Sequence, residues 1–431
     1  MRFLTLTVLL FFTLTLAMAQ NDLMKQRWNK IDTYLNDALP KSALTDLNKI
    51  YSEAKEKNDV DNQVKALIYI MRCNDMSEED AFEKDITFIR KEIATAVFPV
   101  NAVLHSMLGE MYWQYFQRSY YRTANITNST NADLNDIQTW DQKTILEAAI
   151  HAYHASLKNK DQLLEYSTDT FKEVIYKSSN HALTENLYDF LGRKALIFFQ
   201  STESSVSRPA EQFNLNDARY FGMPAEFITL TIQSTDTLSL HLYAMQLMQD
   251  LEKIHLNDTD PSTLIDLTII RLKFVTINSA LPNTDELRLV TLLKLEQASL
   301  KFQVSTDVSY EIAVIWHERA GDMSGVQNSP KYPDANITSV QICDAAIKRF
   351  PNAEGAHNCE QVKQTILRPS FVLTLEEVNI PQAPFRTLTV YNNIKMLSLR
   401  VIRLTANEAE KLKIDLDYKY DQRFELFKPY L

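Results

Sequence analysis

The chain has 431 residues, a formal net charge of −10 at pH 7 and six glycines. Proteins average about 7% glycine, the residue that most turns with a positive φ angle use. This composition therefore disfavours an all-β or doubly wound fold and favours long helices joined by short polar loops. The acidic charge is spread along the chain and no basic stripe with interleaved aromatic residues occurs, so nucleic acid is not an expected partner.

Residues 1–19 have the pattern of a Sec-type signal peptide. Arg2 supplies a positive start, residues 4–16 form an apolar stretch, and Ala17-Met18-Ala19 is a small-x-small cleavage site. The apolar stretch is shorter than the roughly 20 residues of a transmembrane helix, and no later segment approaches that length. We predict cleavage near Ala19 and a mature chain without a spanning segment, exported to the periplasm, the cell surface or the medium.

From residue 20 to residue 368 the pattern is helical, because apolar residues recur every three or four positions. Polar connections rich in Ser, Asn and Asp are predicted at 123–134, 201–216 and 321–338. The aromatic run Met111–Phe116 is interpreted as helix core. Predicted helices include the apolar faces 28–35, 44–54, 64–71, 103–116, 145–153, 187–198, 238–251, 267–275, 289–300 and 340–367.

The last of these ranges, 340–367, has the form of one helical hairpin. Ala345 and Ala346 lie in its first helix, Pro351 follows that helix, and Ala356 lies in the second. Small residues at helix crossings and a proline after the first helix are features of tetratricopeptide-type repeats. We predict an α-solenoid of degenerate repeats, which usually binds partners through a concave face; an irregular helical bundle is the alternative.

Cys343 and Cys359 are the candidate site residues of this hairpin, and Cys73 stands apart from them. An exported chain can oxidise such a pair, and successive antiparallel helices can bring the two Cα atoms within disulfide range. The alternative is a pair of small buried apolar side chains at a helix interface.

The pattern changes to alternation with period two at residues 369–431, as expected for antiparallel strands. Three half-buried strands are predicted, at Phe371–Leu375, around Leu388 and Val390, and at Leu397–Val401, with a charged and initially helical segment after Thr405. Three strands are too few to cover a two-sheet sandwich. We therefore predict the start of a truncated β-sandwich domain.

The sequence contains no convincing set of catalytic residues, so we do not expect an enzyme, a cofactor or a metal site. His317-Glu318 lacks the second histidine of a zincin helix. His151 and His154 share a helix but have no further ligands nearby in the sequence, so ordinary packing is the better interpretation.

The junction between helices and strands resembles large exported alpha-2-macroglobulin-like proteins of the Bacteroidota. The resemblance is carried by AIKRFPNAEGAHNCEQVKQTI from Ala346 and RPSFVLTLEEVNIPQAPFRTLTVYNNIKMLSLRVIRL from Arg368. Weaker support comes from WDQKTILEAAIHAYHASL at Trp140 and NLYDFLGRKALIFF at Asn186. It implies a helical N-terminal region followed by macroglobulin β-sandwich domains.

The resemblance also implies endopeptidase inhibition by trapping, with proteases as partners of the full-length protein. In this family a protease cleaves a bait segment, the macroglobulin domains collapse around it, and some members attach to it through a thioester. No bait region is identified in this chain, and Cys359 is followed directly by Glu360-Gln361, one residue short of the thioester spacing. No functional residue can therefore be carried over. The alternative function is an exported helical-repeat scaffold or glycan-uptake partner without inhibitor activity.

Overall fold

The computed structural model describes residues 22–123, 133, 136–175, 186–201, 212–324, 329–375, 380, 383–384, 386–398, 405–408 and 410. The predicted signal peptide lies outside these ranges. The described residues are mainly helical and include one two-stranded antiparallel sheet. The chain divides into two compact units, Met1–Cys359 and Glu360–Leu431. The division falls within the last helix, whereas the predicted domain boundary at 368 coincides with the end of that helix.

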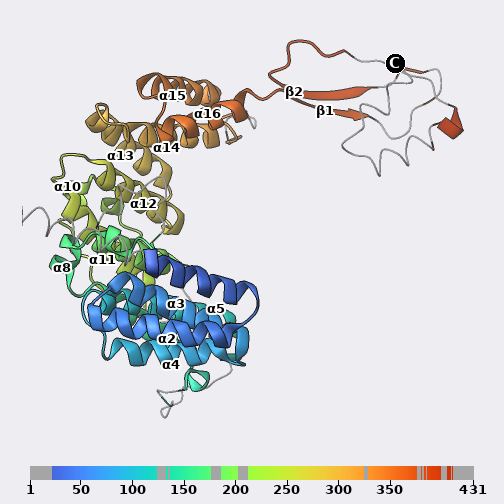
Figure 1. Cartoon of the computed structure of the whole chain (residues 1–431). Helices are drawn as coiled ribbons and strands as arrows, with labels where there is room; N and C mark the ends of the chain where they lie inside the picture. The colour runs from blue at the N-terminus through green and yellow to red at the C-terminus, as the bar shows by residue number, and fades with distance from the viewer. Residues whose placement is uncertain are drawn as a thin grey trace, which may run out of the picture. The chain divides into compact units, whose positions relative to one another are not determined.

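Every helix predicted from apolar periodicity is present (Figure 1). The long helices α4 and α14 and the short helices α6, α8 and α10 were not predicted. The helix α15 begins inside the predicted loop 321–338, so that loop prediction was wrong at its end. A helix over 22–36 is followed by α2 (Pro40–Lys57), α3 (Val60–Ser77), α4 (Ala81–Ile93), α5 (Val100–Arg118), α6 (Tyr120–Thr123), α7 (Gln142–Ser156), α8 (Lys160–Glu165), α9 (Leu187–Phe199), α10 (Pro224–Phe227), α11 (Leu240–His255), α12 (Ser262–Asn278), α13 (Thr284–Ser299), α14 (Ser305–Arg319), α15 (Ala335–Arg349) and α16 (Glu354–Leu367), with 3-10 turns η1 (Ile137–Thr139), η2 (Thr168–Phe171) and η4 (Ala218–Phe221).

Several of these helices begin at a side chain that caps a free backbone N–H group. Asp59, Asp141, Asn186 and Ser239 each accept a hydrogen bond from the first turn of the helix that follows. At the other end of α2, Asn58 takes the left-handed conformation, with φ of 54°, and stops the helix. Asn58 therefore takes the left-handed position that glycine occupies at the ends of many helices.

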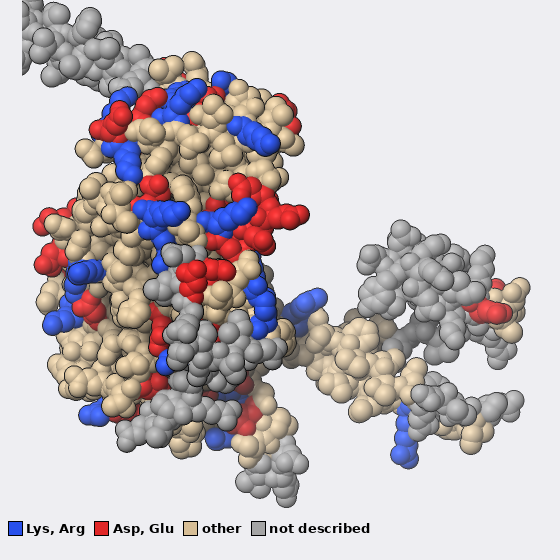
Figure 2. Space-filling view, turned by 90° about the horizontal axis from the view of Figure 1, so that it is seen from below, with Lys and Arg blue, Asp and Glu red and all other residues tan. Residues whose placement is uncertain are grey.

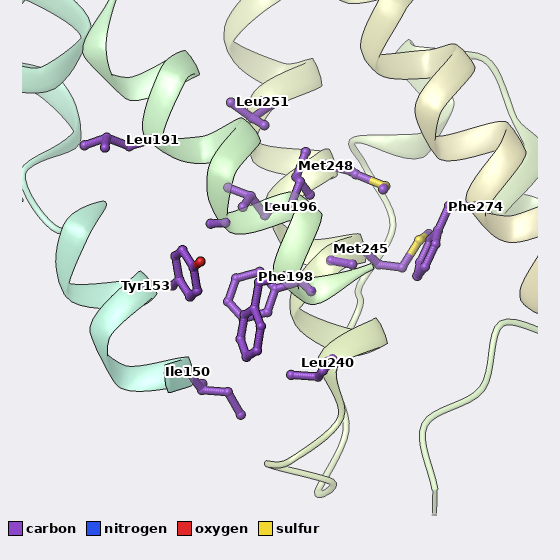
Figure 3. Close-up of a cluster of buried hydrophobic side chains, with 14 of the residues drawn as sticks. Ile150, Tyr153, Leu191, Leu196, Phe198, Leu240, Met245, Met248, Leu251 and Phe274 are labelled. Carbon is purple, nitrogen blue, oxygen red and sulfur yellow. The ribbon is translucent and has the colours of Figure 1, made fainter. Parts of the chain in front are cut away.

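The core of the first unit runs through successive helices that pack on one another. Pairs in extensive contact include α2 with α3, α5 with α7, α13 with α14 and α14 with α15. Figure 3 shows the middle of this core, where side chains of α7, α9, α11 and α12 converge. The rings of Tyr153 and Phe198 stack there with centroids 4.9 Å apart. A smaller cluster joins the first helix to α2 and α3 around Ile31, Leu47 and Ile70.

Two glycines allow helices to approach more closely than any side chain permits. A Cβ atom built on Gly109 of α5 would lie 2.8 Å from the Tyr153 ring of α7. One built on Gly355 of α16 would lie 2.3 Å from the backbone nitrogen of Asp307 in α14. Glycine is therefore required here for contact between helices, and none of the described glycines has a positive φ angle.

The second unit contains the strands β1 (Ser370–Leu375) and β2 (Thr387–Asn392), which pair in antiparallel register from Ser370 opposite Asn392 to Leu375 opposite Thr387 (Figure 1). The first two predicted strands are confirmed. Of the third, 397–401, only residues 397–398 are described, and they belong to no strand. The predicted helical turn after Thr405 is present at 406–408, where Thr405 and Glu408 bond to each other's backbone N–H groups.

Candidate interaction site

The two-stranded sheet β1–β2 carries exposed apolar side chains on both of its faces. Because directly paired residues share a face, the register places Phe371 with Tyr391 on one face and Val372 with Val390 on the other. These side chains are 53%, 66%, 62% and 61% exposed, in that order. Stable soluble proteins rarely expose so many large apolar side chains in one place unless a partner covers them.

The prediction of half-buried strands was therefore wrong for the described residues. Leu388 is 63% exposed, and Leu373 is the only β1 residue of intermediate burial. The physical reason is that a two-stranded ribbon has no second layer to pack against. The register also places the apolar positions of β1, 371, 373 and 375, on the face opposite to Leu388 and Val390 of β2, so the strands do not share one apolar face.

The candidate cysteines Cys343 and Cys359 lie on the consecutive helices α15 and α16, and both are fully buried. The structure describes them as thiols and not as a disulfide. A hydrogen bond with the Cys343 thiol, together with burial, raises the pKa of the Cys359 thiol. The two sulfur atoms thus lie within hydrogen-bonding reach, and oxidation of the pair stays a prediction. Of the two alanines expected at this crossing, Ala346 is buried but Ala345 is exposed.

A buried ion pair between Arg271 of α12 and Glu252 of α11 was not predicted. Both side chains are 0% exposed, and Nε of Arg271 donates to Oε1 of Glu252 over 2.7 Å. The guanidinium also donates to the carbonyl oxygens of Tyr220 and Gly222 and lies 4.1 Å from the centroid of the Phe227 ring. Arg271 therefore attaches the segment around η4 and α10 to two long helices.

His255 at the end of α11 is a second buried charge centre. Its Nε2 lies 3.0 Å from Oδ1 of Asp189 and its Nδ1 lies 2.6 Å from Oδ2 of Asp258. Burial lowers the pKa of His255, but the hydrogen bonds and charges of the two carboxylates outweigh it and raise the pKa above its ordinary value. With an acceptor at each ring nitrogen, the protonated imidazolium is the form that satisfies both contacts.

The weaker motifs of the sequence have structural roles in the described residues. His154 packs against the rings of Phe199 and Tyr243, and burial is the main reason why its pKa is lowered. His317 bonds through Nδ1 to the side chain of Asn336 over 2.8 Å. In the run Met111–Phe116, the residues Met111, Tyr112, Tyr115 and Phe116 are buried, which confirms their interpretation as helix core.

No group of three or more His, Cys, Asp or Glu side chains placed to hold a metal ion occurs among the described residues. Within the same residues, no helix combines the length and the apolar character that crossing a membrane requires. On the face shown in Figure 2, basic and acidic side chains lie interspersed over the helical part of the chain.

The chain matches no family model, no curated protein and no solved structure. The exposed apolar faces of β1–β2 are therefore the candidate interaction site on structural grounds alone. Alternation in the sequence located these strands, but it carried no signal for their exposure or for the buried charges of the helical unit.

Proposed function

We propose that the chain is the N-terminal part of an exported alpha-2-macroglobulin-like endopeptidase inhibitor, in which the helical region is a scaffold and β1–β2 belongs to the first macroglobulin-type sandwich. The observation that carries the proposal is the exposure of large apolar side chains on β1–β2, at Phe371, Leu388 and Val390 among others. Further strands and a second sheet would cover one face and both edges of such a ribbon.

The order of elements supports the same proposal. The last helix ends at Leu367 and β1 begins at Ser370, so the change from helix to strand lies at the junction whose sequence resembles this family. The hairpin α15–α16, with Ala346, Ala356 and Gly355 at its contacts, fits a tetratricopeptide-like repeat at the end of the array. Proteases would be partners of the complete protein, and no described residue has a catalytic role in this proposal.

The decisive experiment uses the complete gene product and trypsin. After incubation, cleavage of a large protein substrate is compared with cleavage of a small chromogenic peptide. Trapping slows the first reaction and spares the second, because the enclosed protease still admits small molecules. Trypsin inactivated at its serine before mixing is the control for capture. It cannot cut a bait segment and should not co-elute with the gene product on gel filtration, whereas active trypsin should. Unchanged cleavage of both substrates rejects the proposal.

A second candidate is an exported helical-repeat scaffold that binds another protein or assists glycan uptake. It is favoured because most of the described residues lie in helices that pack on one another. Stacked helical hairpins usually present a binding face. In this case trypsin cleaves both substrates at an unchanged rate in the presence of the complete gene product, which instead retains a specific exported partner.

A further inference from the structure

The described segment 212–239, which precedes α11, is long and mostly irregular, yet it is well packed. From residue 212 to residue 239 it contains only the short elements η4 and α10. Irregular segments longer than about 12–15 residues are uncommon in compact domains and are usually either functional or disordered linkers. The buried side chains of Leu215, Ile232 and Asp236 attach this one to the core.

Two extended stretches of this segment, 212–217 and 231–236, alternate between inward and outward side chains. In the first stretch Gln212, Asn214 and Asn216 are exposed around buried Leu215, and in the second Gln233 and Thr235 are exposed on either side of Ser234. The outward positions are therefore occupied by amides and hydroxyls rather than by charged groups.

Hydrogen bonds from three directions hold the two stretches in place. The N–H of Phe213 donates to the carboxylate of Asp236 over 3.3 Å, which connects the stretches to each other. Nε2 of Gln246 in α11 donates to the carbonyl oxygen of Ile232 over 2.9 Å. The N–H of Ala280, just after α12, donates to Oδ1 of Asn216 over 2.6 Å. The exposed amides are thus presented from a preorganised backbone, which lowers the entropy cost of binding.

A shallow, open hollow of about 610 Å³ lies over the two stretches. Its one carboxylate, Asp217, is paired with Arg219 over 2.6 Å, so the hollow offers no unbalanced charge to an ionic ligand. It is lined by amides, hydroxyls, this carboxylate and two aromatic rings, from Gln212, Phe213, Asn214, Asn216, Asp217, Tyr220, Gln233, Ser234 and Thr235.

We infer that this hollow binds a neutral oligosaccharide. Side-chain amides and hydroxyls both donate and accept hydrogen bonds, which matches sugar hydroxyls that do the same. The half-buried ring of Phe213 supplies an apolar surface for one face of a sugar ring. An added peptide strand would instead need a free strand edge or apolar side-chain pockets, and the outward positions here are polar. The inference is independent of the trapping proposal.

The test applies the purified chain to an array of neutral and anionic oligosaccharides and measures the strongest binder by calorimetry. The variant Gln233→Ala/Thr235→Ala removes two exposed side chains that bond to no other described residue, so its thermal unfolding should match that of the wild type. Gln297→Ala is the matched control, because Gln297 is an exposed amide on α13 outside the hollow.

The expected result is saturable binding to a neutral oligosaccharide that the double variant weakens roughly tenfold, from the loss of two hydrogen bonds, and that Gln297→Ala leaves unchanged. Three results would overturn the inference: no binding to any neutral oligosaccharide, equal binding by the double variant, or retention of anionic oligosaccharides only. None of these outcomes bears on the trypsin assay, so the two proposals fail separately.

Discussion

The replacement Arg271→Met removes the buried charge of α12 while keeping a long flexible side chain. The wild-type guanidinium bonds to Glu252 and to the carbonyl oxygens of Tyr220 and Gly222, all within the core. In the variant, the Glu252 carboxylate stays buried without a cation. Burial already raises the pKa of Glu252, and Arg271 opposes that shift, so the variant carboxyl should take up a proton more readily.

The magnitude follows from these contacts. Removing one partner of a buried ion pair costs about 3–5 kcal/mol, because the other partner is left uncompensated. The variant Arg271→Met/Glu252→Leu removes both charges, and such replacements are often neutral or stabilising relative to the intact pair. The carbonyl oxygens of Tyr220 and Gly222 still lose their donor, at about 1–3 kcal/mol for each unsatisfied group. We expect the double variant to recover part, but not all, of the lost stability.

The assay is urea unfolding of each variant, followed by helical circular dichroism, with hydrogen exchange over 218–227 as a local readout. Arg193→Met is the matched control, since the pair of Arg193 with Asp266 is partly exposed and should contribute no more than about 1 kcal/mol. A cost below about 1 kcal/mol for Arg271→Met, or a double variant no more stable than the single one, would refute the reasoning.

Three further predictions concern other parts of the helical unit. The raised pKa of His255 means that its charge stabilises the fold fully below its unfolded pKa of about 6.5 and that this contribution is lost as the pH rises through the folded pKa. The stability advantage of wild type over His255→Gln should therefore shrink as urea unfolding is repeated from pH 6 upward, and a constant difference would contradict this. Gly355→Ala should lower the unfolding temperature despite the better helix propensity of alanine, because its Cβ would meet backbone atoms 2.3 Å away. At Gly321 the atom nearest to an added Cβ lies 3.5 Å away, so Gly321→Ala should be close to neutral. If both substitutions lowered the unfolding temperature equally, the close contact at Gly355 would not be the cause. Under denaturing, non-reducing conditions the protein should show one reactive thiol if Cys343 and Cys359 are joined, and three would exclude the bond.

Most helices with one apolar face were predictable from the sequence. The helix α4 was missed although Phe82, Ile86 and Ile89 recur in it at helical spacing, and its inner face also includes the buried Asp85. The helix α14 was missed because Ser305, Ser309 and Glu311 are polar residues that lie buried. Polar side chains that bond within the interior are indistinguishable in sequence from solvent-facing ones.

The candidate sites were predictable only in part. Alternation located β1 and β2, but exposure depends on which layer covers a strand, and the residues of the strand do not encode that. Arg271 and Glu252 lie on different helices and meet only through tertiary contact, so no local sequence pattern predicts their pairing. Likewise, Gln233 and Asn214 belong to stretches whose sequence is that of an ordinary polar loop. Only the structure shows that both residues line one hollow.

The central claim is that β1–β2 is part of a larger sandwich in the complete protein. Two variants, Phe371→Cys and Val390→Cys, place a thiol on opposite faces of the ribbon, against three native cysteines that are all buried. In the chain of 431 residues both introduced thiols should react rapidly with a maleimide probe, since the wild-type side chains are more than half exposed. In the complete gene product the account predicts strong protection of one position and continued reaction of the other, and rapid reaction at both would contradict it.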